Sequence, residues 1–280
     1  MTQTFEYLAA TDLDEVIAAL ADGGTSVLAG GQSLVLELAA AEAPPRRVVD
    51  INRVAGLDTL AEADGFLRVG PLVRHRTFES DTVGGPLGDL LRVVVRHIGH
   101  PPIRARGTML GSLAYAHPAA EWPVVAVALD AELVLTGPAG CRTVPAASFF
   151  TGPFSTARRP EEFLAECRLP VLPAGTGIGY AEDRRTTIFP EAAAFAAVTV
   201  AGGRVVAASI GLVNAGPCPV RARAAERALV GSDFSDAAIA AAAATAAETD
   251  ATGTARRPAL RTLTRRALSQ ARERTVIRCE

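Results

Sequence analysis

This chain is organised around one stretch, Val27-Leu28-Ala29-Gly30-Gly31-Gln32-Ser33-Leu34. An apolar run ends at two adjacent glycines and is followed by an apolar-rich segment over residues 35–41, a pattern that predicts a strand, a tight turn and a helix. Adjacent glycines can adopt positive φ and carry no Cβ, so consecutive N–H groups can point at one anion. On this segment alone, a phosphate-binding turn and a simple chain reversal are equal alternatives.

Length and composition limit the class of protein. With 280 residues, the chain is long enough for one large or two modest domains with a substantial core. Its net charge of −2 argues against a nucleic-acid-binding role. The longest apolar stretches, such as Pro123 to Leu129, are shorter than the ~20 residues of a membrane span. The N-terminus also lacks the order of a secretory signal, so we expect a soluble, cytoplasmic protein.

The cysteine and lysine contents exclude several kinds of site. The four cysteines, Cys141, Cys167, Cys218 and Cys279, are far apart and form no Cys-x-x-Cys motif. This spacing argues against an iron–sulfur or zinc site built from this chain alone. The chain contains no lysine, which excludes a Walker-type phosphate loop and a Schiff-base mechanism.

The segments flanking the first glycine turn predict a strand–helix–strand unit. An apolar stripe from Leu13 to Leu20 predicts a helix that begins with a capping box of Thr11 and Asp14. A strand is predicted over residues 47–51, and its Asp50 lies about twenty residues beyond Gly30, as does the ribose-binding acid of a dinucleotide fold. The turn has no Gly-x-Gly-x-x-Gly spacing, however, so a Rossmann fold is rejected.

A second segment of small residues follows Pro101-Pro102. These prolines end a helix predicted over residues 87–98, and residues 103–114 are predicted to form a loop flanked by arginines. The hydroxyls of Thr108 and Ser112, with glycine N–H groups, suit a second part of an extended ligand, whereas an ordinary turn is favoured for the segment alone. Further along, Glu121 precedes an apolar helix, where it either complements the helix N-terminus or accepts hydrogen bonds from ligand hydroxyls.

The remainder of the chain predicts a sheet followed by helices. Residues 162–170 are predicted to form an edge strand that ends at a proline, and residues 172–177 a domain boundary. Strands over 192–200 and 204–213 are joined by a hairpin at Gly202-Gly203. Helices are predicted over 220–229, 237–247 and 260–271. This part therefore forms an α+β unit.

Two motifs, the stretch from Ala29 to Leu34 and Thr108-Met109-Leu110-Gly111-Ser112, resemble the flavin-binding motifs of the FAD subunit of molybdenum hydroxylases, the carbon monoxide dehydrogenase and xanthine dehydrogenase flavoprotein family. Similar residues recur from Val49-Asp50-Ile51 to Arg265-Arg266-Ala267-Leu268, so the resemblance covers nearly the whole chain. It implies an α+β fold with a split FAD-binding domain of the vanillyl-alcohol-oxidase (PCMH) type over residues 1–173, with subdomains of about 1–55 and 56–173. A small domain of antiparallel sheet plus helices would follow over residues 178–280.

The resemblance also implies roles for individual residues. The amides of the first turn and the Ser33 hydroxyl would hold the FAD pyrophosphate, and the second motif would complete the clamp. Glu121 stands where the family usually has an aspartate that binds FAD hydroxyls, and Arg185 would compensate for a family lysine near the flavin. Leu110 departs from the family by replacing a glycine, and His117 by replacing an aspartate. The implied FAD-binding residues are Leu28, Ala29, Gly30, Gly31, Gln32, Ser33, Leu34, Thr108, Gly111, Ser112, Glu121, Leu169 and Arg185.

The implied function is electron transfer within a complex. The chain would accept electrons from the iron–sulfur clusters of a small partner subunit and pass them through FAD to an external acceptor, while substrate is oxidised on a molybdopterin-binding large subunit. No side chain of this hetero-oligomer's FAD subunit is assigned a catalytic role. Two alternatives remain: a standalone FAD-dependent oxidoreductase acting on a small molecule, and a degenerate, non-catalytic scaffold that binds partners, which Leu110 would support.

Overall fold

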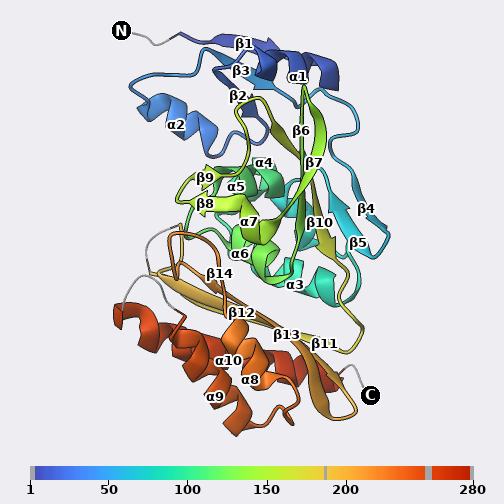
Figure 1. Cartoon of the computed structure of the whole chain (residues 1–280), viewed down its shortest axis with the longest axis vertical. Coiled ribbons are helices and arrows are strands. Elements are labelled where there is room, and N and C mark those ends of the chain that lie inside the picture. Colours follow the sequence, from blue (N-terminus) through green and yellow to red (C-terminus); the bar gives the residue numbers. More distant parts are fainter. Residues whose placement is uncertain (1–3, 186–187, 250–253, 278–280) are drawn as a thin grey trace.

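The computed structural model describes residues 4–185, 188–249 and 254–277. Figure 1 shows three parts that follow one another along the long axis of the molecule. The N-terminal part contains β1 to β3, the middle part extends from β4 to β10, and the C-terminal part contains β11 to β14 with the last helices. The mixture of helices with separate parallel and antiparallel sheets is the predicted α+β class.

The N-terminal part is a small parallel sheet with the strand order β1-β3-β2. Its elements are β1 (Glu6–Ala9), α1 (Leu13–Ala21), β2 (Thr25–Leu28), α2 (Leu34–Ala40) and β3 (Arg47–Asp50). The predicted order of strand, turn and helix from β2 to α2 is confirmed. The predicted capping box is wrong by one residue. Asp12 is the N-cap and accepts a hydrogen bond from the Glu15 N–H at 2.9 Å, while the Glu15 carboxylate accepts one from the Thr11 N–H at 2.8 Å.

The middle part is built on a five-stranded antiparallel sheet with the order β4-β5-β10-β6-β7. The strands are β4 (Leu60–Ala63), β5 (Phe66–Val69), β6 (Glu132–Gly137), β7 (Gly140–Pro145) and β10 (Phe163–Pro170). Because β10 pairs with β5 on one side and β6 on the other, the prediction of an edge strand is wrong. Pro170 is tolerated because it is the last residue of the strand.

Short helices lie beside this sheet (Figure 1). They are η1 (His75–Glu79), α3 (Gly85–Val95), α4 (Pro101–Arg106), α5 (Met109–Tyr115), α6 (Glu121–Ala128) and α7 (Ala146–Phe149), with a two-stranded ribbon of β8 (Phe150–Gly152) and β9 (Ser155–Thr156). The loop predicted over residues 103–114 is therefore mostly helical. The helix predicted to end at these prolines, α3, already ends at Val95. Pro101 and Pro102 instead begin α4, because a proline in the first helical turn loses no intrahelical hydrogen bond.

The C-terminal part is an antiparallel sheet with the order β11-β12-β13-β14, covered by helices. Its elements are β11 (Thr176–Asp183), β12 (Ala192–Ala201), β13 (Arg204–Val213), β14 (Val220–Arg221), α8 (Arg223–Leu229), α9 (Asp236–Ala247), η2 (Thr254–Arg256) and α10 (Arg257–Ile277). The predicted hairpin is confirmed, with positive φ at both Gly202 and Gly203. The helix predicted from residue 220 begins three residues later, because Val220 and Arg221 pair with β13.

Both faces of this C-terminal sheet are buried. Along β12, Ala192, Ala194 and Ala196 pack with the helices, whereas Ala193, Phe195 and Ala197 join the core of the middle part. One hydrophobic core therefore continues across the predicted boundary at residues 172–177, and the division into domains stays a prediction. Among the described residues, no helix combines the length and apolar character needed to cross a membrane.

Two glycines of β11 allow α10 to lie directly on the sheet. A Cβ built on Gly179 would lie 1.9 Å from the Ala267 carbonyl oxygen, and one on Gly177 would lie 1.9 Å from that of Ala271. These atoms belong to the backbone, so a rotamer change cannot relieve the overlap. The sheet and helix would have to separate.

We expect Gly179→Ala to lower the free energy of unfolding by about 3 kcal/mol, the upper range for overpacking, because α10 must move. Gly152→Ala is the matched control, since its Cβ would meet only Ser155 Cβ at 3.8 Å. Urea unfolding of both variants measures the difference. Equal stabilities for the two variants would contradict the close packing of β11 and α10.

Candidate functional site

The first glycine turn, residues 29–33, connects β2 to α2, and its two glycines serve different purposes. Gly31 has a φ of +76°, a conformation that L side chains rarely adopt. Gly30 is buried, and a Cβ on it would lie 2.5 Å from the Arg106 carbonyl oxygen and 2.8 Å from Gly107 Cα. The first turn therefore lies directly against a segment that is distant in sequence.

That segment is the second glycine turn, residues 106–108, which joins α4 to α5. Thr108 is the N-cap of α5, and its hydroxyl oxygen accepts a hydrogen bond from the Gly111 N–H at 3.0 Å. Thr108 is 2% exposed, and this hydrogen bond leaves its own O–H free to act as a donor. Leu110, which occupies the position of a family glycine, is 2% exposed and packs in the core of the middle part. The Leu110 side chain thus fills space in the core. Of the next two residues, Gly111 is exposed and Ser112 is half-buried.

The other predicted residues of the first turn lie at or near the surface. Gln32 is exposed and Ser33 is half-buried, and the Ser33 side chain makes no capping hydrogen bond to the described helix α2. The residues Leu28, Ala29 and Leu34 are half-buried around the turn. Leu169 does not join this group: it is 1% exposed in the core of the β5-β10-β6 sheet. Its predicted contact with FAD stays a prediction.

A chain of polar contacts connects both turns, and the sequence analysis did not find it. The Arg74 guanidinium donates to the Arg106 carbonyl oxygen at 2.5 Å and to Asn52 Oδ1 at 2.5 Å. Asn52 Nδ2 donates to the Ala29 carbonyl oxygen at 2.8 Å. Asp50, considered above as a ribose-binding acid, instead accepts hydrogen bonds from Tyr7 and Asn52 at 2.6 Å each.

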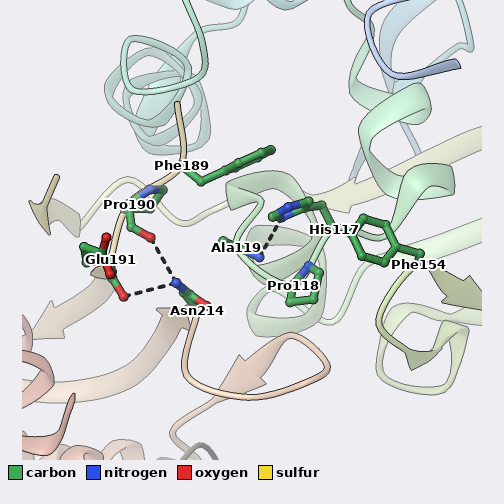
Figure 2. Close-up of a pocket in the computed structure, with 8 residues that line it drawn as sticks. All are labelled: His117, Pro118, Ala119, Phe154, Phe189, Pro190, Glu191 and Asn214. Carbon is green, nitrogen blue, oxygen red and sulfur yellow. Dashed lines mark hydrogen bonds between the residues drawn. The ribbon is translucent and has the colours of Figure 1, made fainter. Parts of the chain in front are cut away.

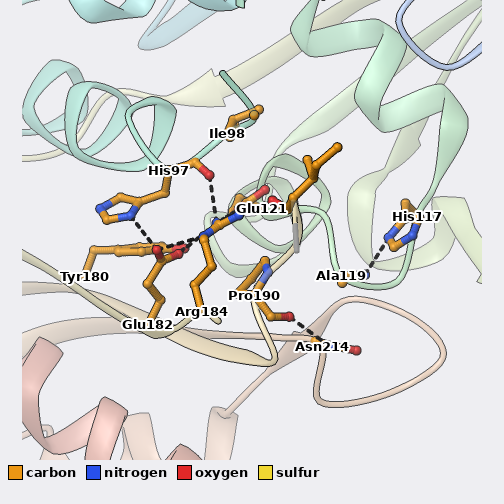
Figure 3. A network of polar contacts seen from close by, with 12 residues as sticks. His97, Ile98, His117, Ala119, Glu121, Tyr180, Glu182, Arg184, Pro190 and Asn214 are labelled. Carbon is orange, nitrogen blue, oxygen red and sulfur yellow. Dashed lines mark hydrogen bonds and ion pairs between the residues drawn. The ribbon is translucent and has the colours of Figure 1, made fainter. Parts of the chain in front are cut away.

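Glu121 is the first residue of α6, is 3% exposed, and belongs to a second polar network, drawn in Figure 3. Arg184 Nη2 donates to Glu121 Oε1 at 3.1 Å and to Glu182 Oε2 at 2.9 Å. Burial raises the pKa of Glu121 to about 8. Burial opposes the ionisation of Glu182 too, but hydrogen bonds from His97 and Arg184 outweigh it and lower the pKa of Glu182 to about 2. The pKa values of two carboxyl groups beside one guanidinium therefore shift in opposite directions.

This network connects two parts of the molecule. His97 and Glu121 belong to the middle part, while Tyr180, Glu182 and Arg184 lie on or just after β11. The rings of His97 and Tyr180 stack with their centroids 4.4 Å apart. Tyr180 and Glu182 alternate along β11 and so share one face, and Arg184 continues the same spacing one residue past the strand. This spacing is a signal that could have identified them from the sequence.

The structure distinguishes Arg184 from the predicted Arg185. Arg184 is half-buried and also donates to the carbonyl oxygen of His97 at 2.7 Å and to that of Ile188. Arg185 is exposed. Arg184 is thus the cation beside Glu121, and a role for Arg185 near the flavin stays a prediction.

A cavity of about 390 Å³ lies next to this network, as Figures 2 and 3 show. The rings of His117 and Phe189 stack with centroids 3.8 Å apart and planes 7° apart, and Phe154 meets His117 edge-on at 5.2 Å. Burial lowers the pKa of His117, and its Nδ1 accepts a hydrogen bond from the Ala119 N–H at 3.1 Å. The lining residues are His117, Pro118, Ala119, Phe154, Phe189, Pro190, Glu191 and Asn214. The stacked pair and Phe154 form an aromatic lining, a kind of surface that suits a planar conjugated ring.

Together these features fit a long ligand that carries phosphates at one end and a planar ring at the other. The helix α5 begins at the second turn and ends beside His117, and its seven residues span about 10 Å. One ligand can therefore reach from the turns to the cavity. In the described part of the chain, no group of three or more metal-ligating side chains gathers.

Comparisons with known proteins agree with this geometry. Residues 3–172 match the family described as the FAD binding domain in molybdopterin dehydrogenase, and residues 183–271 match the CO dehydrogenase flavoprotein C-terminal domain. The chain is 37% identical to the 6-hydroxypseudooxynicotine dehydrogenase complex subunit alpha of Paenarthrobacter nicotinovorans, over 86% of this chain and 82% of that protein. It is 34% identical to the carbon monoxide dehydrogenase medium chain of Hydrogenophaga pseudoflava, over 85% and 84% of the two chains.

A solved structure is similar over the whole length. A chain of the reconstituted CO dehydrogenase from Oligotropha carboxidovorans superposes with a TM-score of 0.90 and 30% identity, covering 99% of each chain. The first family alone accounts for more than half of this chain, and the second for most of the remainder. The chain therefore belongs to the FAD-binding flavoproteins of the molybdopterin dehydrogenases, oxidoreductase subunits whose cofactor is FAD.

Proposed function

We propose that this chain is the electron-transferring FAD subunit of a molybdenum hydroxylase-type complex. It receives electrons from the iron–sulfur clusters of a small partner subunit and passes them to an external acceptor, while a molybdopterin-binding large subunit oxidises the substrate. The observation that carries this proposal is the contact of Gly30 with the backbone of residues 106 and 107, which unites the two halves of a diphosphate site. Relatives named as a dehydrogenase complex subunit and as a medium chain support the role within a complex.

The chain's own residues bind and orient FAD, which supplies the redox chemistry when bound. The amides of Gly30, Gly31 and Gln32 and the Ser33 hydroxyl hold one side of the diphosphate. Thr108, Gly111 and Ser112 hold the other side. Because the chain has no lysine, the long cationic side chains available near the diphosphate are arginines, and backbone N–H and hydroxyl groups donate the hydrogen bonds. The aromatic cavity excludes water from one side of the isoalloxazine ring.

Glu121 binds hydroxyl groups of FAD, with Arg184 holding the carboxyl group in place. The division into a split PCMH-type domain over residues 1–173 and a C-terminal domain over 178–280 belongs to the same proposal, supported by the similarity to CO dehydrogenase. The burial of Leu110 in the core argues against a degenerate scaffold, which this residue had favoured.

Co-purification separates the complex from a standalone flavoenzyme. We expect the chain, expressed with its neighbouring genes, to be recovered with iron–sulfur and molybdenum-containing subunits, and metal analysis of the complex measures this. Turnover of a small molecule by the isolated flavin-loaded chain would instead favour the standalone enzyme.

The first glycine turn offers a direct test of FAD binding. Gly30→Asp should abolish FAD binding, because it adds both a carboxylate beside the phosphates and a Cβ that overlaps the Arg106 carbonyl oxygen. Gly30→Ala should weaken binding by roughly 10- to 100-fold through the overlap alone. Gly84→Ala is the control, because a Cβ there meets nothing within 4 Å. Titration of FAD fluorescence gives the Kd, and a wild-type chain that never acquires a flavin spectrum would refute the proposed function.

The buried Glu121 predicts a pH dependence of stability. Its pKa rises from 4.5 to about 8 on folding, so between these values the folded state binds more protons than the unfolded state. Its contribution to stability therefore falls as pH rises through this window, by up to about 1.4 kcal/mol per pH unit. Glu121→Gln should lack this fall. Urea unfolding from pH 5 to 9 tests this, and a stability difference between wild type and variant that does not change with pH would contradict it.

A further inference from the structure

We propose that Arg74 is a positioning residue that holds the two glycine turns at the separation required by the FAD diphosphate. The inference rests on the proposed function, because it assigns the diphosphate to these turns. Arg74 precedes η1, and its backbone forms an isolated antiparallel bridge with Thr108 of the second turn. Its guanidinium reaches the Arg106 carbonyl oxygen and Asn52 Oδ1, both at 2.5 Å.

Asn52 carries the connection to the first turn, and its amide orientation is determined by its partners. Nδ2 donates its two hydrogens to the Ala29 carbonyl oxygen at 2.8 Å and to Asp50 Oδ1 at 2.6 Å. Oδ1 accepts from Arg74. A flipped amide would place its NH2 against the guanidinium and its oxygen against two acceptors. Only one orientation of the Asn52 amide therefore connects Ala29 to Arg74 and, through Arg74, to Arg106.

Both constraints on the turns meet at one atom, the Arg106 carbonyl oxygen. Gly30 approaches it so closely that a Cβ would lie 2.5 Å away. Arg74 donates a hydrogen bond to the same oxygen. The absence of a Cβ at Gly30 lets the turns approach, and Arg74 keeps them from separating. A preformed site lowers the entropic cost of ordering the turns when a ligand binds.

The charge of Arg74 has a second consequence. The side chain is half-buried, and burial lowers the pKa of the guanidinium, as do nearby Arg106 and Arg76, while Asp50 opposes them. An arginine remains charged at neutral pH under these conditions. Arg74 therefore places a fixed positive charge at the second turn, one side chain away from the first turn, close to where an anion of two phosphates is expected. The effect of Arg74 on the position of the turns and the effect of its charge on FAD binding must be separated by experiment.

Three variants of the full chain make this separation, with FAD titration as the measurement. Arg74→Met removes both hydrogen bonds of the guanidinium and its positive charge. We expect its Kd for FAD to rise roughly 10- to 100-fold. Arg74→Lys keeps the charge but replaces the two donating nitrogens with one, so it cannot reproduce the geometry of both hydrogen bonds. Asn52→Leu keeps Arg74 but breaks the connection to Ala29. Both should weaken binding by roughly 10-fold. Arg76→Met is the matched control, because it removes a nearby exposed arginine charge.

The ³¹P NMR spectrum of FAD bound at saturation distinguishes positioning from general stability. Arg74→Met and Asn52→Leu should shift the two diphosphate resonances, whereas a purely structural role would lower the melting temperature and leave them unchanged. Should Arg74→Met fail to fold, Arg74→Lys and Asn52→Leu provide the same test.

The outcomes separate this inference from the proposed function. A wild-type chain that binds no FAD would refute both. A wild-type chain that binds FAD, with Arg74→Met binding no more weakly than Arg76→Met, would overturn only the role of Arg74. Weakened binding by Arg74→Met alone, with Arg74→Lys and Asn52→Leu like wild type, would show that Arg74 acts through its charge and would overturn positioning.

Discussion

The contact between Gly30 and the backbone of residues 106 and 107 is the constraint on which the site depends. It joins the parallel sheet of the N-terminal part to the helices α4 and α5 of the middle part. Only a residue without a Cβ allows this approach, since the opposing atoms are backbone and cannot rotate away. The second glycine, Gly31, meets a different requirement, because its φ is positive. Two adjacent glycines therefore perform two tasks.

The second organising feature is the polar network around Arg184. One guanidinium donates to Glu121 from the middle part and to Glu182 from β11. The pKa values of the two carboxyl groups shift in opposite directions, because burial dominates at Glu121 whereas hydrogen bonds from His97 and Arg184 dominate at Glu182. The network lies next to the aromatic cavity, so the contact between these two parts also shapes the proposed ring-binding end of the site. Apolar contacts join the same two parts of the molecule, because β11 also contributes Ile178 and Tyr180 to the core of the middle part.

Local patterns predicted local structure well. The strand and helix on either side of Gly30-Gly31, the Gly202-Gly203 hairpin and the alanine-rich helix α9 all depend on periodicity and turn chemistry within a few residues. Some errors were local, such as the capping box and the loop predicted over residues 103–114, which became helical where a glycine-containing segment favoured a loop. Others came where neighbours distant in sequence decide the outcome. The strand β10 became central because β5 and β6 pair with it.

The sequence by itself determined the two glycine motifs, the absence of lysine and the α+β class, because these follow from residue identity and short-range spacing. It also sufficed to indicate FAD through resemblance to a family. Only the tertiary structure decided that the turns touch, that Arg74 and Asn52 connect them, and that Arg184 rather than Arg185 lies beside Glu121. These contacts join residues far apart in the chain, and no local pattern encodes the distance at which two folded segments meet.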